Sequence, residues 1–115
     1  MASLLSDLKW LIGGLGIPCE TGVQSGKAPD TYTVLTPILD DYPVMGDDVP
    51  LDEVQEVRIS LFTRGNYRAL KQSIEKACIK AGLCITDRRY VGREDDTGYF
   101  HYAVDTANCY SLEED

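Results

Sequence analysis

The only histidine of the chain, His101, lies five residues after the acidic pair Asp95 and Asp96. Metal sites and acid–base catalysts use a histidine and carboxylates in this way. If residues 99–109 form a strand, each residue advances about 3.3 Å, so His101 lies roughly 10 Å or more from the tip of the preceding turn. It cannot easily share a ligand with either aspartate at that distance. The stretch therefore favours an acidic hairpin turn and a surface histidine over a metal or catalytic site.

Two further acidic pairs, Asp40-Asp41 and Asp47-Asp48, lie between candidate strands. Carboxylate oxygens suit hard cations. However, the spacing fits no calcium-binding loop, and no lysine or histidine lies near as a base. The chain also has no G-x-S-x-G motif and no glycine-rich phosphate loop. We therefore expect no enzyme, no cofactor and no metal site, and a small metal-dependent enzyme such as a nuclease stays as the less favoured alternative.

Three arginines, Arg88, Arg89 and Arg93, form a small basic cluster in a chain that is otherwise rich in acids. Ion pairs within the chain are the simplest interpretation of this cluster. The alternative is a salt bridge between subunits, because segregated opposite charges allow copies of one chain to associate head to tail.

The bulk composition indicates a single globular domain spanning residues 1–115. Hydrophobic residues make up 43% of the 115 residues and charged residues 26%, with a formal net charge of -8. An acidic chain is poorly suited to binding along a nucleic-acid backbone, but it is compatible with a protein that DNA merely passes. The N-terminal segment predicts an amphipathic helix rather than a signal peptide, and no stretch is long and apolar enough to span a membrane. The four cysteines show no zinc-site spacing, and we expect them to be small buried side chains in a reducing cytoplasm.

Hydrophobic spacing predicts two helices and five strands. The first helix is capped by Ser3 and ends at Gly13-Gly14, and the second is capped by Asn66 and ends at Gly82. The expected strands cover residues 15–20, 31–39, 54–63, 83–92 and 99–109. Residues 40–53 carry two prolines and a glycine, which predicts an exposed loop. The order α-β-β-β-α-β-β predicts an α+β fold in which two helices cover one face of an antiparallel (mixed) sheet.

The chain resembles a family of small phage proteins over nearly its whole length. The stretches that carry the resemblance are "VQEVRISLFTRGNY" before the second helix and "ITDRRYVGREDDTGYFHYAVD" after it. The N-terminal amphipathic helix and the "YTVLTP" strand extend it. The chain is in this respect similar to the tail-terminator or tail-completion proteins encoded in the head–tail joining cluster of long-tailed bacteriophages and prophages of Gram-positive bacteria.

The resemblance implies a non-enzymatic subunit that assembles as a homo-oligomeric ring, typically a hexamer. Such a ring caps the tail tube and joins it to the head, so its partners are the tail tube protein and the head-connector proteins. It is formed in the host cytoplasm and resides in the virion, and genomic DNA passes through it without specific binding. Another neck or head-completion component is the alternative within this class. From charge and loop placement we expect the subunit or partner contacts to include these residues: Arg88, Arg89, Arg93, Asp95, Asp96, Asp47 and Asp48. We also expect residues 40–53 to move or become ordered on assembly.

Overall fold

The computed structural model describes the backbone of residues 3–21, 28–46 and 49–111, and the side chains of these residues outside 41–46 and 49–51. The helices and strands follow in the predicted order, and the α+β class is confirmed. Their bounds are α1 (Leu4–Gly14), β1 (Cys19–Thr21), β2 (Thr31–Gly46), β3 (Val49–Thr63), α2 (Tyr67–Lys80), β4 (Cys84–Arg93) and β5 (Phe100–Ser111).

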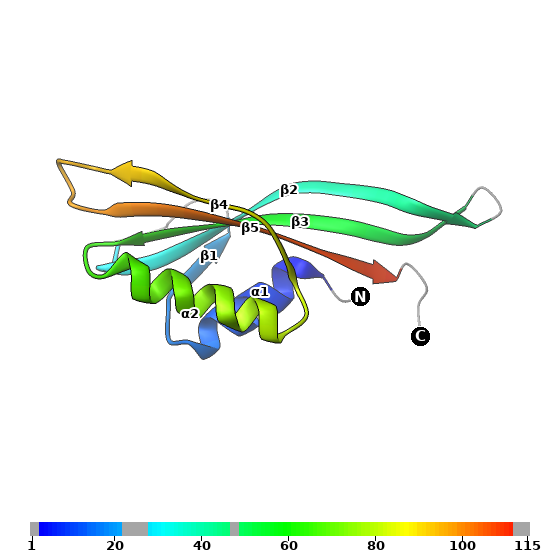
Figure 1. Ribbon diagram of the computed structural model, residues 1–115, viewed down its shortest axis with the longest axis horizontal. Helices are drawn as coiled ribbons and strands as arrows, with labels where there is room; N and C mark the ends of the chain where they lie inside the picture. The colour runs from blue at the N-terminus through cyan, green and yellow to red at the C-terminus, as the bar shows by residue number, and fades with distance from the viewer. Residues whose placement is uncertain (1–2, 22–27, 47–48, 112–115) are drawn as a thin grey trace.

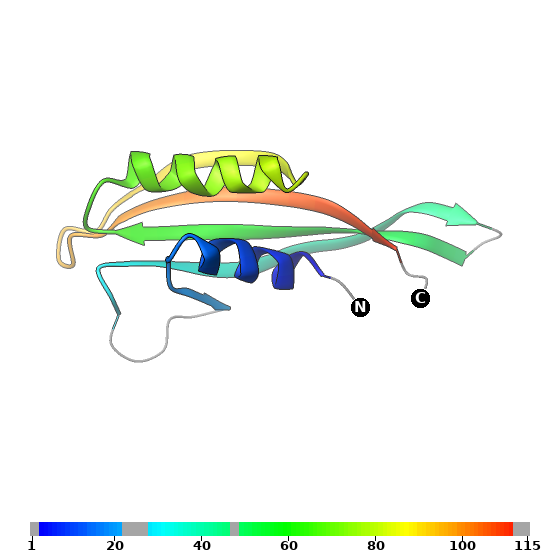
Figure 2. The ribbon, with the colours of Figure 1, turned by 90° about the horizontal axis from the view of Figure 1, so that it is seen from below.

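The five strands form one mixed sheet in the order β1-β2-β3-β5-β4. The short strand β1 runs parallel to β2, and the other neighbours are antiparallel. Both helices lie against the same face of the sheet (Figures 1 and 2). We call the opposite side, which neither helix covers, the open face.

Helix α1 begins where the sequence predicted. The side chain of Ser3 accepts a hydrogen bond from the backbone N–H of Ser6, which satisfies one of the donors left free at a helix start. Its buried residues Leu4, Leu8 and Ile12 recur at helical spacing and face the sheet. Complete burial of one such side chain contributes about 1.5–3 kcal/mol, so this apolar stripe holds α1 in place.

Helix α2 also has the predicted ends. Asn66 accepts hydrogen bonds from the backbone N–H groups of Arg68 and Ala69. After the C-cap residue, Gly82 adopts a φ of +83°, a conformation that a residue with a Cβ atom rarely takes. Ile74 and Cys78 are buried, as the apolar stripe predicted. Glu75, a charged residue of the same helix, is buried as well.

The hydrophobic core lies between the two helices and the sheet. Strand β3 confirms the predicted alternation, since Val57, Ile59 and Leu61 are all buried on the helix-covered side. Leu35 of β2 and Val104 of β5 flank Ile59 in the sheet and are buried with it. One cluster of buried side chains therefore joins both helices to the central strands.

The prediction of a loop at residues 40–53 was wrong. Strand β2 continues to Gly46 and β3 begins at Val49, so the two strands form a long hairpin. Figures 1 and 2 show this hairpin extending beyond both helices, and the molecule measures 54 Å along its longest axis against 25 and 23 Å along the others. We call residues 36–55 the arm and the rest of the sheet with its helices the body. Register shifts after Pro37 and after Asp41 allow β2 and β3 to stay paired despite the prolines and the glycine from which a loop was predicted.

The expectation of buried cysteines holds only for Cys78. Cys19 is half-buried, and Cys84 and Cys109 are exposed. Cys84 lies opposite Ala107 in the β4–β5 ladder, and Cys109 is two residues further along β5. Both therefore lie on the open face, where no helix covers them. The predicted strand at residues 15–20 is also shorter, because only Cys19–Thr21 pairs with β2.

Candidate assembly surfaces

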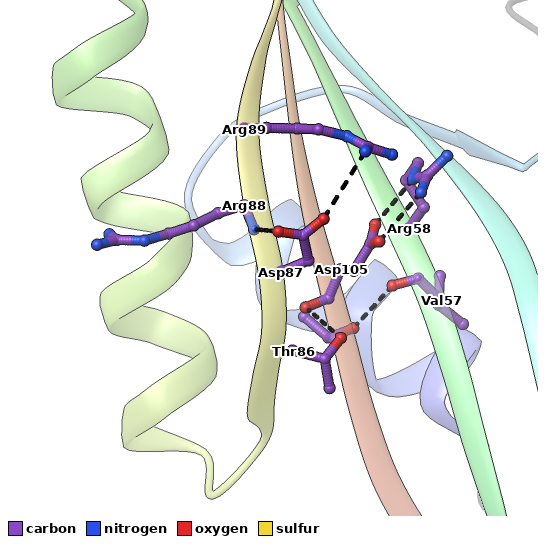
Figure 3. Close-up of polar contacts among 8 residues, drawn as sticks. Val57, Arg58, Thr86, Asp87, Arg88, Arg89 and Asp105 are labelled. Atoms are coloured by element: carbon purple, nitrogen blue, oxygen red, sulfur yellow. Dashed lines mark hydrogen bonds and ion pairs between the residues drawn. The ribbon is translucent and has the colours of Figure 1, made fainter.

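Strand β4 presents its arginines on both sides of the sheet. Arg88 points toward α2, whereas Asp87 and Arg89 point to the open face (Figure 3). The ladder with β5 shifts register between Ile85 and Asp87 and again between Tyr90 and Gly92. These bulges change the direction in which the side chains of β4 point, so the basic cluster is not one continuous patch.

Arg88 makes an ion pair within the chain. Its Nη1 atom donates a 2.9 Å hydrogen bond to Oε1 of Glu75, whose side chain is only 7% exposed. The Nζ atom of Lys71 lies 4.0 Å from Oε2 of Glu75, and that oxygen has no hydrogen-bond partner among the described residues. A buried carboxylate needs such cations. More than half of the Arg88 side chain stays exposed, so the same group remains accessible from outside.

The other predicted contact residues have looser surroundings. Arg89 lies 3.9 Å from a carboxylate oxygen of Asp87, and Arg93 lies 3.5 Å from one of Asp95. All four side chains are at least about half exposed, so these pairs contribute little to stability. Asp96 is exposed in the turn that Gly98 closes with a φ of +79°. Asp47 and Asp48 lie outside the described residues.

A better-formed ion pair lies on the open face, and the sequence did not reveal it. Nε and Nη2 of Arg58 donate to the two carboxylate oxygens of Asp105 at 2.8 and 3.1 Å (Figure 3). The Asp105 side chain is 13% exposed, and its hydrogen bond raises the pKa of Arg58. The opposite charges of Arg58 and Asp105 were the available signal, because the two residues become direct cross-strand partners once β3 pairs with β5.

His101 is not the solvated surface histidine that was expected. Its ring stacks on Phe62 with 4.3 Å between centroids, and Phe62 stacks in turn on Tyr32. The Nε2 atom is buried without a hydrogen-bond partner among the described residues. Burial lowers the pKa of His101, the nearby Glu94 raises it, and Arg58 lowers it further. These contacts make His101 part of an aromatic row on the open face.

Metal chemistry gains no support from the geometry. Among the described residues, no group of three or more His, Cys, Asp or Glu side chains is placed to hold a metal ion. A shallow groove of about 280 Å³ lies between α1, the end of α2 and β5, lined by Asp7, Trp10, Leu11, Ala81, Leu83 and Asn108. At its edge the hydroxyl of Tyr110 donates to Asp7, and burial together with this bond raises the pKa of Tyr110 to about 12.

Charge is divided unevenly between two parts of the molecule. Residues 67–93, which span α2 and β4, contain seven Lys and Arg against Glu75 and Asp87, a net charge of +5. We call them the basic flank. The arm contains six Asp and Glu and no Lys or Arg, a net charge of -6. In the sheet, β5 and β3 separate β4 from β2.

Large apolar side chains are exposed on both of these surfaces, and outside them Trp10 and Leu15 are exposed at the end of α1. Ile38 and Leu39 are exposed on the arm, and Ile79, Tyr90 and Val91 are exposed on the basic flank. Each surface therefore combines apolar groups with charges of one predominant sign. This composition is typical of the contact surfaces of assembling proteins rather than of a catalytic cleft.

No protein-family model matches the chain, and no curated protein matches it. Among the described residues, no helix is long and apolar enough to cross a membrane. The arm and the basic flank are therefore the structural basis for inferring a function.

Proposed function

We propose that this chain is a non-enzymatic subunit of a ring at the head–tail junction of a long-tailed bacteriophage, where it terminates the tail tube for joining to the head. The resemblance of residues 54–67 and 85–105 to tail-terminator proteins supports this role. A homo-oligomeric ring needs two different surfaces on each copy, because every copy contacts the next through unlike faces. The virion is the location that this role implies.

The observation that carries the proposal is the arm. Its side chains from Thr36 to Asp40 are all exposed, whereas those from Asp52 to Gln55 are half-buried. In its described part, β5 pairs with the arm as far as Asp52, opposite Ser111. A long hairpin outside the core costs conformational entropy without burying much apolar surface in the monomer. Another molecule that covers the arm would bury this surface and offset that cost.

Light scattering on the purified protein, over a range of concentrations and salt, tests this proposal. We expect a species of about six copies at high concentration, visible as rings by electron microscopy. A protein that stays monomeric throughout contradicts the proposal, and one that in addition binds a divalent ion and hydrolyses nucleic acid favours the metal-dependent enzyme.

The predicted contact residues have their own test. Replacing Arg88 and Arg89 together by Ala should weaken assembly if the basic cluster contributes to subunit contacts. Because Arg88 also pairs with Glu75, the single variants must be compared at equal folded fraction. Unchanged assembly in the double variant removes these two arginines from the interface.

A further inference from the structure

We propose that copies of this chain contact each other head to tail, with the arm of one copy lying against the basic flank of the next. This inference rests on the proposed function and specifies which surfaces meet. The molecule that covers the arm is thus a second copy of the same chain.

The first argument is that the chain leaves both surfaces uncovered. Strand β1 pairs with the outer edge of β2 at Thr33, Val34 and Leu35, and no other described strand pairs with that edge from Thr36 onward. At the other side of the sheet, no described strand lies beyond β4. Neither helix lies over the arm beyond its base, where the backbone N–H of Leu4 in α1 donates to Oε1 of Gln55 (Figures 1 and 2).

The second argument is the complementarity of charge. The arm carries -6 and the basic flank +5. Lys76 and Lys80 lie one helical turn apart on α2, both exposed, and neither has an ion-pair partner among the described residues. A copy of the chain is therefore attracted to its neighbour in one orientation, arm to flank, and repelled arm to arm or flank to flank.

The third argument concerns the type of contact. Extension of the sheet from β2 of one copy to β4 of the next would require regular free edges. Pro37 lacks a backbone N–H, and β4 is bulged at Thr86 and Val91, which the register of the β4–β5 ladder skips. Such features blunt an edge against backbone pairing. Side chains must therefore make the contact, with Ile38 and Leu39 packing against apolar groups of the flank inside a rim of charges.

The proposed contact joins two unlike surfaces, so it does not close as a two-fold dimer. Repetition of one unlike contact generates a ring when the rotation closes and a filament when it does not. The pairing of arm and flank therefore supplies the type of contact that the proposed ring requires.

Charge-reversal variants of the full chain test the inference by sedimentation and light scattering. One variant reverses the flank (Arg68→Glu, Lys76→Glu and Lys80→Glu), which changes its net charge from +5 to -1. The other reverses the arm (Asp40→Lys, Asp41→Lys, Asp52→Lys and Glu53→Lys), which changes its net charge from -6 to +2. Each by itself should associate at least about 100-fold more weakly than the wild type, because like charges then face each other. Lys9→Glu is the matched control, since Lys9 is an exposed cation of α1 outside the flank, and it should assemble as the wild type does.

An equal mixture of the two reversed variants is the decisive sample. The acidic arm of one variant then meets the basic flank of the other, and the reversed arm meets the reversed flank. Assembly should return to within about 10-fold of the wild-type affinity. Far-UV circular dichroism of each variant establishes that it is folded.

The outcomes separate this inference from the proposed function. If the wild type forms rings but the reversed variants form them equally well, or if the mixture does not restore assembly, the inference is overturned and the ring proposal stands. If the wild type stays monomeric to about 1 mM in dilute salt, both are overturned. If the flank binds a short DNA duplex and the arm variants assemble normally, the flank is a nucleic-acid surface and the inference fails.

Discussion

Strands β2 and β3 run through both the body and the arm, but the interactions that stabilise the two regions differ. Within the body, Leu35 and Ile59 are paired across the ladder, and both are fully buried beneath the helices. Leu39 lies at the base of the arm and is exposed, and its partner Glu56 is the first residue of β3 in the body. The comparison teaches that strand pairing continues well past the point where the core ends. Burial in the core stabilises the body, whereas the arm has cross-strand hydrogen bonds and little burial.

The largest effect should come from a truncation in the body set against one in the arm. Ile59→Ala removes a fully buried side chain at the centre of the sheet and should lower the free energy of unfolding by about 2–5 kcal/mol. Leu39→Ala in the arm should change it by less than about 0.5 kcal/mol. Urea unfolding of the two variants at equal concentration measures both. Similar losses in the two variants would show that the arm is part of the cooperative core.

The arginines of β4 provide a comparison of intermediate size. Arg88→Ala leaves the buried Glu75 carboxylate with Lys71 as its remaining cation, and it should cost about 1–3 kcal/mol. Arg89→Ala removes a partner only from the exposed Asp87 and should cost less than about 0.5 kcal/mol. Chemical unfolding measures the stability of both single variants and of the double variant in which Glu75→Gln is added to Arg88→Ala. Glu75→Gln should recover part of the stability that Arg88→Ala loses, and no recovery would show that Arg88 acts through something other than Glu75.

The smallest effect should be a pH dependence that originates on the open face of the body. Burial lowers the pKa of His101 below its unfolded value of 6.5, so below that pH the unfolded chain binds more protons than the folded one. The contribution of His101 is therefore fully present above pH 6.5 and is lost as the pH falls through the window beneath it. Because part of the ring is exposed, the loss should stay below about 1 kcal/mol. Unfolding of the wild type and of His101→Phe between about pH 5 and about pH 7.5 compares the slopes. Equal slopes would show that His101 is not the responsible group.

Local signals in the sequence were sufficient for the body. Apolar spacing, the caps Ser3 and Asn66, and the terminal Gly82 act within a few residues of chain, and each element that they predicted is present. The order of elements then led to the correct fold class. The turn before β5 was also correct, because Gly98 supplies its positive φ.

The arm was missed because its stabilisation is not local. Prolines, a glycine and acidic pairs usually indicate a loop, and nothing in residues 40–53 alone reveals that two such segments pair with each other and, at Asp52 and Glu53, with β5. The burial of Glu75 was not predicted, for a similar reason. Its burial depends on Arg88, thirteen residues later on another element. The contact residues remain predictions, because an interface depends on a second molecule.

Replacement of the arm's outer part is the most direct test of the account. Residues 42–53 are exchanged for Asn-Gly, which joins the paired residues Asp41 and Val54 by a two-residue turn. The mass and the thermal unfolding of this shortened chain are then measured beside those of the wild type. The account predicts a folded monomer whose unfolding temperature is within a few degrees of the wild-type value, under conditions in which the wild type assembles. A shortened chain that assembles as the wild type does, or that no longer folds, would contradict it.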